Sequence, residues 1–310
     1  MTENKIFMGI DVSKETLDIS LNQKHYKIAN SEKGIKGFID KHSKLLRAVK
    51  LCALEATGRY EVLVMTMLQK HGLPVHRANP LHVKNFARAS NQKAKTDKID
   101  AYLLEKYAIF VQDTENGDPV ITDTYVALQQ LRTVERSLED ELHGHKCRLA
   151  HFSGVAKKIT DKQINACEKQ LIAVRTEIDR VIKADAKLHT KKQAMLKVKG
   201  IGSQIANVLI CDMPELGTMT AKQVVSLTGV APFTKQSGKS TQQSHIQGGR
   251  FYVRKALYMA ALVCIKHSPI LREVYERLKG AGKPSKVALV AVMRKIIIFI
   301  NTLMREVMSA

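Results

Sequence analysis

The sequence has 310 residues, 45% of them hydrophobic, which is enough for two domains with separate cores. A formal net charge of +21 predicts a polyanionic partner, either nucleic acid or an anionic membrane surface. No run of about 18 consecutive apolar residues and no apolar leader is present, so we expect neither a membrane span nor a secretion signal. The cysteines have no CxxC spacing, so we expect no zinc site and a cytoplasmic protein with reduced thiols.

The first 110 residues alternate strand-like and helix-like patterns. Strands are predicted at residues 6–10, 16–21, 25–28, 51–54 and 73–76, and helices at 32–46, 59–71 and 97–110. This order predicts a mixed sheet in which helical crossovers join the parallel strands.

The middle of the chain contains a polar linker and then a long helical pattern. The linker covers residues 111–126, and the pattern from 127 to 185 has almost no Gly or Pro. Its second half carries an apolar seam with heptad spacing, formed by Ile164, Cys167, Leu171, Val174, Ile178 and Val181. Two interpretations are open: an antiparallel hairpin with residues 127–150, or a dimerising coiled coil.

The last third of the chain carries most of the positive charge. Residues 191–310 have a net charge of +14, against +8 for residues 1–110 and −1 for residues 111–190. Helical patterns at 251–278 and 286–307 end the chain. We therefore expect the strongest nucleic-acid contacts in this region.

Four carboxylates occupy positions suited to a divalent metal ion. Asp11 and Glu55 each follow an apolar strand-like run, whereas Asp97 and Asp100 lie three residues apart on one face of a predicted helix. Mg²⁺ prefers oxygen ligands, and two such ions can stabilise the attacking and the leaving oxygen of a phosphodiester. Ordinary solvated acids are the competing interpretation, and spacing alone leaves both open.

Candidate phosphate contacts are concentrated in the last third. The turn Gly200-Ile201-Gly202 has the form of a helix-hairpin-helix, in which glycines let the backbone approach a phosphate and the next helix supplies free N–H groups. The candidates are Lys199, Gly200, Gly202, Lys235, Lys239, Arg250, Arg254 and Lys255. The alternatives are an ordinary helix–helix turn and a solvated basic face, but the charge imbalance favours nucleic acid.

Ser237 precedes Gly238 and lies between Lys235 and Lys239. Neighbouring cations or a metal ion can activate such a hydroxyl as a nucleophile. Taken alone, these residues fit an ordinary loop better.

Considered together, these motifs resemble the DEDD transposases of the insertion sequence 110 family, which are related to the Piv-type site-specific DNA invertases. The segments that carry the resemblance are residues 9–14, 55–60, 95–101, 200–202, 229–238 and 254–259. Each segment alone is a weak signal, but the ordered set spans nearly the whole chain.

The resemblance implies an α/β region followed by an all-α region. It implies a RuvC-like (ribonuclease H-fold) DEDD catalytic domain at residues 1–110, a helical coiled-coil linker at 111–190, and a helical C-terminal transposase domain at 191–310. In this chain the implied Mg²⁺ ligands are Asp11, Glu55, Asp97 and Asp100. The implied nucleophile is Ser237, with Ser240 as its competitor.

The resemblance also implies partners. Members of the family act as oligomers whose composite sites combine domains of different subunits, form a covalent phosphoserine link, and use a structured non-coding bridge RNA to choose DNA. We therefore expect donor and target DNA, a bridge RNA and a homo-oligomer, either a dimer or a tetramer, and no membrane.

The predicted function is a Mg²⁺-dependent DNA transposase or site-specific recombinase with a serine nucleophile. The first alternative is a RuvC-type hydrolytic nuclease or junction resolvase, in which water attacks the DNA. The second alternative is a non-catalytic nucleic-acid-binding protein.

Overall fold

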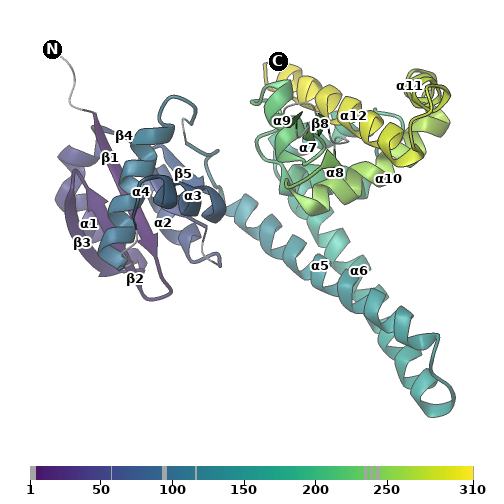
Figure 1. Cartoon of the computed structure of the whole chain (residues 1–310). Helices are drawn as coiled ribbons and strands as arrows, with labels where there is room; N and C mark the ends of the chain where they lie inside the picture. Colours follow the sequence, from purple (N-terminus) through teal and green to yellow (C-terminus); the bar gives the residue numbers. More distant parts are fainter. Residues whose placement is uncertain are drawn as a thin grey trace. The chain divides into compact units, whose positions relative to one another are not determined.

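The computed structural model describes residues 5–56, 58–92, 96–115, 117–233, 236–237, 240–241 and 245–309, with backbone alone at 236–237 and 240–241. The chain divides into two compact units, Met1–Thr122 (unit 1) and Asp123–Ala310 (unit 2). Unit 1 combines a sheet with helices, and unit 2 is mainly helical (Figure 1).

Unit 1 contains a five-stranded mixed sheet, as the sequence predicts. Its elements are β1 (Ile6–Val12), β2 (Thr16–Leu21), β3 (Lys24–Ala29), α1 (Glu32–Leu46), β4 (Val49–Glu55), α2 (Glu61–Lys70), β5 (Val75–Ala78), α3 (Pro80–Ala89) and α4 (Asp97–Val111). The strand order is β3-β2-β1-β4-β5. The pairs β3–β2 and β2–β1 are antiparallel, whereas β1–β4 and β4–β5 are parallel.

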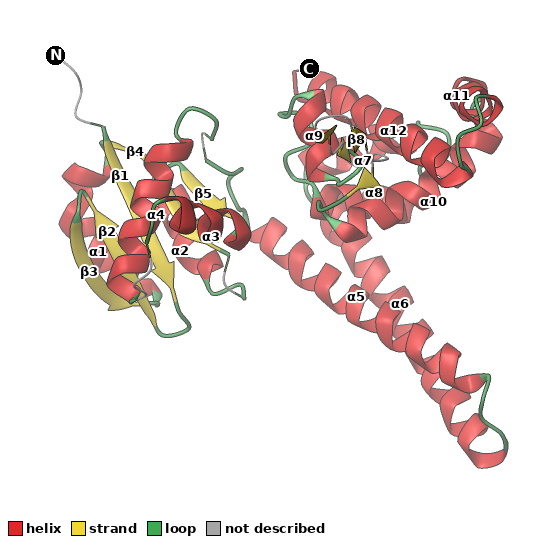
Figure 2. Ribbon diagram, viewed as in Figure 1, coloured by secondary structure: helices red, strands yellow, loops and turns green. Residues whose placement is uncertain are grey.

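Helices cover both faces of this sheet (Figure 2). Helix α4 packs on β1, β2 and β4, and α3 packs on α4, whereas α1 contacts α2. The core on the α4 side joins Phe7 of β1 and Ala53 of β4 to Leu104 and Ala108 of α4. Side chains alternate along a strand, so every second residue counted from Phe7 in β1 and from Ala53 in β4 faces α4.

Unit 2 consists of a long helical hairpin and a helical bundle. Its helices are α5 (Asp123–Leu149), α6 (Gly154–Ala184), α7 (Ala186–Leu196), α8 (Ser203–Asp212), α9 (Ala221–Leu227), α10 (Phe251–His267), α11 (Pro269–Gly280) and α12 (Ser285–Ser309). Between α9 and α10, the described residues form four two-residue strands: β6 (Pro232–Phe233), β7 (Gln236–Ser237), β8 (Ser240–Thr241) and β9 (His245–Ile246).

The helical pattern at 127–185 forms two helices rather than one. Helices α5 and α6 lie side by side as a hairpin of the same chain (Figure 1). The seam residues Ile164, Cys167, Leu171 and Ile178 are buried along it. The hairpin is therefore the interpretation that the structure supports for this seam.

The predicted helix at 251–278 is also divided. Pro269 begins α11, and Ser268 has extended backbone angles, φ −115° and ψ 111°. A proline ring disfavours helical angles at the preceding residue and removes a backbone donor, so the helix stops there.

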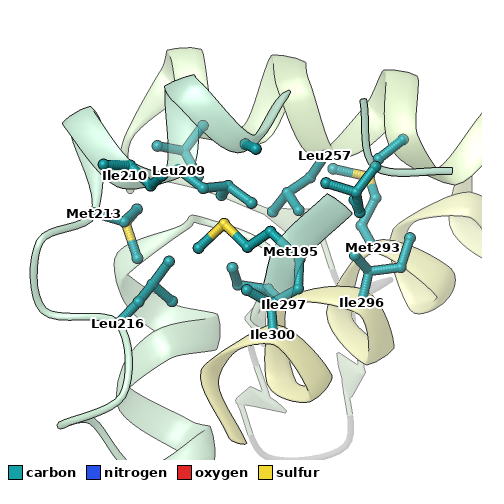
Figure 3. Close-up of a cluster of buried hydrophobic side chains, with 14 of the residues drawn as sticks. Met195, Leu209, Ile210, Met213, Leu216, Leu257, Met293, Ile296, Ile297 and Ile300 are labelled. Atoms are coloured by element: carbon teal, nitrogen blue, oxygen red, sulfur yellow. The ribbon is translucent and has the colours of Figure 1, made fainter. Parts of the chain in front are cut away.

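The core of unit 2 lies in the bundle. Side chains of α7, α8, α10 and α12 meet there, among them Met195, Leu209, Leu257 and Ile297 (Figure 3). By length and composition α12 alone among the described helices is apolar enough to cross a membrane, but half of its most apolar stretch is buried in the protein. A core helix of a soluble bundle has the same composition.

Candidate functional site

Two of the four predicted acids lie at neighbouring strand ends of unit 1. Asp11 is near the end of β1, and Glu55 is the last residue of β4. These strands are parallel and in register up to Ile10 opposite Leu54, so Asp11 and Glu55 occupy the next pair. Asp11 lies four residues after Phe7, and Glu55 lies two residues after Ala53. Because side chains alternate along a strand, both carboxylates are on the face of the sheet that α4 covers.

The other two acids begin α4. Asp97 is the first residue of the helix, and Asp100 lies in its first turn. Thr96 caps this end, since its side chain accepts a hydrogen bond from the backbone N–H of Ile99 at 3.3 Å. The helix N-terminus carries partial positive charge, which favours carboxylates there. Lys95, part of the motif in the sequence, lies outside the described residues.

A glycine contact fixes α4 against the sheet. A Cβ atom on Gly9 would lie 2.1 Å from the backbone nitrogen of Glu105 and 2.2 Å from the carbonyl oxygen of Ala101. Only glycine permits this approach. The hydroxyl of Ser20 donates to the Glu105 carboxylate, and the backbone N–H of Gln23 donates to it at 3.0 Å. The first turn of α4 is thereby held near Asp11.

Asp18 and Lys27 belong to the same site, although sequence analysis did not select them. Strand pairing places Asp18 opposite Asp11, and Lys27 opposite Asp18. Lys27 Nζ lies 3.1 Å from Asp18 Oδ2 and 3.5 Å from Asp97 Oδ2. The pairing register of β1, β2 and β3 could have identified both residues, because it places side chains of β2 and β3 beside Asp11.

The acids influence one another electrostatically. The pKa of Asp11 is raised from its usual 3.8 to about 6. Burial is the largest cause, and the remaining causes are the negative charges of Asp100, Asp97, Asp18 and Glu55. All four predicted carboxylates are therefore close enough for their charges to interact at Asp11.

The donor set fits a hard divalent cation. Carboxylate oxygens are the ligands that Mg²⁺ prefers. Burial raises the pKa of Asp11 most, and the neighbouring negative charges, which a cation would offset, raise it further. Within the described residues, no three His, Cys, Asp or Glu side chains are grouped closely enough to ligate one ion as they stand. Lys27, an ammonium on Asp97, occupies the position of a cation at one of these carboxylates.

Asn30 connects the loops that follow the two strand-end acids. Its side-chain amide donates to the carbonyl oxygen of Ser13 at 2.9 Å and to that of Tyr60 at 3.2 Å. Ser13 lies in the turn after β1, and Tyr60 precedes α2 in the loop after β4. Asn30 therefore joins the backbone segments that follow Asp11 and Glu55, and sequence pattern offered no signal for this.

In unit 2, Ser237 lies in a short antiparallel pair. It ends β7, and its cross-strand partner in β8 is Ser240, the competing candidate. The predicted phosphate contacts Lys235 and Lys239 lie outside the described residues. The next pair outward, β6 with β9, joins Phe233 to His245.

Glycines bring together the two ends of the segment that contains β6 to β9. Gly229 and Gly249 both have φ of +69°, and a Cβ on Gly229 would lie 2.2 Å from the carbonyl oxygen of Gly248. Arg250 follows directly and donates to Glu215 at 2.8 and 2.5 Å, and to the carbonyl oxygen of Asp212 at 2.7 Å. Arg250 thus anchors the segment within unit 2, and its role as a phosphate contact stays a prediction.

The remaining phosphate candidates differ in their surroundings. A Cβ on Gly200 would lie 2.4 Å from Cys264 Sγ, so packing against α10 requires glycine here, and its contact with a phosphate stays a prediction. Gly202 is exposed, has open space around it and caps α8, and Lys199 is exposed beside it. Arg254 donates to the carbonyl oxygen of Gly248.

Lys255, like Lys199, is an exposed cation among these candidates. Its side chain is 57% exposed and lies 3.5 Å from Glu139. Such an exposed pair is weak and easily exchanged for a phosphate.

Two family models match the chain. A DEDD-type IS110 transposase model covers residues 8–152, and a model of the transposase IS116/IS110/IS902 family covers residues 192–276, together about three quarters of the sequence. The chain belongs to the IS110 family of transposases. The four carboxylates fall within the first model, and Ser237 falls within the second.

Individual relatives agree with this family. The chain is 25% identical to the pilin gene-inverting protein of Moraxella bovis, over 98% of this chain and 97% of that protein. The corresponding protein of Moraxella lacunata is equally similar. A 43.6 kDa protein of insertion element IS110 from Streptomyces coelicolor is 28% identical over 46% of this chain and 35% of its own length.

Proposed function

We propose that this IS110-family protein is a DNA transposase or site-specific recombinase that cleaves and rejoins DNA through Ser237, assisted by Mg²⁺. The observation that carries the proposal is the convergence of four carboxylates on Asp11, in a chain with a net charge of +21. Carboxylates so close together repel one another, and a bound cation would offset this repulsion.

We infer a RuvC-like, ribonuclease H fold for the N-terminal region. The mixed strand order β3-β2-β1-β4-β5, with acids at the ends of β1 and β4, supports this assignment. We further propose three functional regions: DEDD chemistry in residues 1–110, coiled-coil helices in 111–190, and the nucleophile and nucleic-acid contacts in 191–310.

In this proposal Asp11, Glu55, Asp97 and Asp100 hold the metal. Bound Mg²⁺ supplies a Lewis acid that stabilises negative charge on the reacting phosphate. The chain itself positions the ligands: Gly9 and Ser20 hold α4 near the sheet, and Asn30 ties the two strand-end loops together.

The proposed covalent step uses Ser237. Its Oγ forms a bond to phosphorus while one bridging P–O bond of the DNA breaks. The serine proton passes to a base, and the departing oxygen takes a proton to become a free hydroxyl. Attack by a hydroxyl of another DNA end reverses these changes, rejoins the strand and releases Ser237, so no outside energy source is needed.

The acids and the serine belong to different compact units, and we propose that they are contributed by different subunits of a homo-oligomer. Donor and target DNA are the proposed substrates, and a structured bridge RNA is the proposed guide. Sequencing of the nucleic acid that co-purifies with the protein tests the guide: a single structured RNA supports it, and random fragments contradict it.

The covalent step is tested with a plasmid that carries the DNA flanking this gene. The protein is incubated with the plasmid and Mg²⁺, stopped with detergent, and examined for DNA-linked protein. We expect an adduct with wild-type protein and with Ser240→Ala, and none with Ser237→Ala or Asp11→Asn. Cleavage without an adduct that survives Ser237→Ala would establish the alternative, a hydrolytic nuclease.

A further inference from the structure

We propose that Lys27 is a built-in counter-cation of the carboxylate site that competes with the metal ion for Asp97. The inference rests on the proposed function, because it concerns how the same acids take up metal. It assigns a role to Lys27 of β3, which is not one of the four predicted metal ligands.

The sheet places Lys27 in a row with two acids. Asp11, Asp18 and Lys27 are successive cross-strand partners on β1, β2 and β3, so their side chains leave the same face of the sheet. This is the face that α4 covers, and the first residue of α4 is Asp97. Lys27 therefore reaches Asp97 from the sheet.

A buried carboxylate holds the ammonium in place. Asp18 is only 4% exposed, and its Oδ1 lies 2.8 Å from His25 Nε2 while its Oδ2 lies 3.1 Å from Lys27 Nζ. A free lysine side chain loses several rotatable bonds on pairing, which weakens most surface ion pairs. Asp18 already restrains Lys27, so less freedom remains to be lost when it meets Asp97.

The charges determine what Lys27 does. Its Nζ lies 3.5 Å from Asp97 Oδ2, a carboxylate that the proposed metal needs. An ammonium and a divalent cation at one carboxylate repel each other over a few ångströms, and because both side chains are largely exposed, solvent and salt reduce this repulsion. Metal binding must therefore displace Lys27 from Asp97 or accept that repulsion, and either cost lowers the affinity of the free protein for metal.

Lys36 provides a matched control. It lies on α1, is exposed, and its replacement by methionine removes the same single charge. The test is Mn²⁺ binding to the full-length protein without DNA, measured by electron paramagnetic resonance of the free ion. Wild type, Lys27→Met, Lys27→Arg, Lys36→Met and Asp11→Asn are compared at low salt.

We expect Lys27→Met to bind Mn²⁺ about 3- to 10-fold more tightly than wild type. Lys36→Met and Lys27→Arg should stay within about twofold of wild type, because the first leaves the pair intact and the second preserves a cation there. Equal binding by Lys27→Met and Lys36→Met, or weaker binding by Lys27→Met, would overturn the inference while leaving the proposed metal site standing. No difference between wild type and Asp11→Asn would overturn both.

A second measurement uses thermal stability. In EDTA, Lys27→Met should melt below Lys36→Met, because Asp18 and Asp97 lose their cation. With saturating Mg²⁺ that difference should shrink, since the metal replaces the lost charge at Asp97. A difference that is the same in EDTA and in Mg²⁺ would contradict competition at Asp97.

Discussion

Carboxylates do different work in the two units. In unit 1, Asp11 is surrounded by other acids, and its pKa is raised to about 6. In unit 2, Asp212 is 7% exposed and lies 3.1 Å from Arg132 and 2.6 Å from Arg136. A buried acid that compensates the charge of buried arginines is costly to remove, whereas an acid surrounded by other acids is a candidate for binding a cation.

The sharpest test of this comparison exchanges one acid in each unit for its amide. Asp11→Asn should reduce adduct formation by about 1000-fold or more while leaving the protein folded, because it removes a proposed metal ligand. Asp212→Asn should instead destabilise unit 2 by about 3 kcal/mol, because it weakens the charge that compensates buried Arg132. Adduct yield and chemical denaturation measure the two effects. A large loss of stability in Asp11→Asn would contradict the comparison.

The contact of α4 with the sheet gives the next largest expected effect. Gly9→Ala places a methyl group against the backbone of Glu105 and should destabilise unit 1 by about 3 kcal/mol. Gly37→Ala in α1 is the control, since a Cβ there meets nothing within 4 Å and should stabilise the helix by about 0.5 to 1 kcal/mol. Equal melting temperatures for the two variants would show that α4 is not held as described.

The raised pKa of Asp11 predicts a pH dependence of metal-free stability. Because the folded protein holds this proton more tightly than the unfolded chain, the free energy of unfolding should fall as pH rises from about 4 to about 6. After discounting for solvent exposure, we expect a loss of about 1 to 2 kcal/mol. Asp11→Asn should abolish this loss, as measured by urea unfolding in EDTA. A wild-type slope of the opposite sign that Asp11→Asn removes would contradict the assignment.

The smallest expected effect concerns the tie between the strand-end loops. Asn30→Ala removes the hydrogen bonds to Ser13 and Tyr60 and should cost about 1 kcal/mol. It should also weaken Mn²⁺ binding, because the loops after Asp11 and Glu55 are no longer joined. Asn165→Ala, at an exposed position of α6, is the control and should change neither the stability nor the Mn²⁺ affinity. Unchanged Mn²⁺ affinity in Asn30→Ala would limit this residue to fold stability.

Much of unit 1 was predictable, because each apolar run is short and ends at a polar residue. The end of β4 at Glu55, the position of Asp11 near the end of β1 and the helix beginning at Asp97 follow from local pattern alone. Helix α3 was missed, because the pattern predicted no helix between the strand at 73–76 and residue 97. Asn79-Pro80 begins this helix, since Asn79 accepts from the N–H of Leu81 and proline suits the first helical turn.

The rest depends on contacts between distant residues. Asp18 and Lys27 join the site through strand register, and Gly200 is explained by Cys264 of α10. Arg250 was expected at a surface because its neighbours are basic, but its partner Glu215 lies 35 residues away. Local pattern carries no information about such pairs, so charge runs alone do not show which basic side chains have acidic partners in the fold.

The central claim is that the acids of one chain act with Ser237 of another. Asp11→Asn and Ser237→Ala proteins, carrying different tags, are co-expressed, and mixed oligomers are isolated and tested for DNA-linked protein. Each variant alone should form no adduct, whereas the isolated mixed oligomers should recover about half of the wild-type yield, because one of the two composite sites in each mixed pair is intact. If the isolated mixed oligomers stay inactive, the acids and the serine act within one chain, and the claim is wrong.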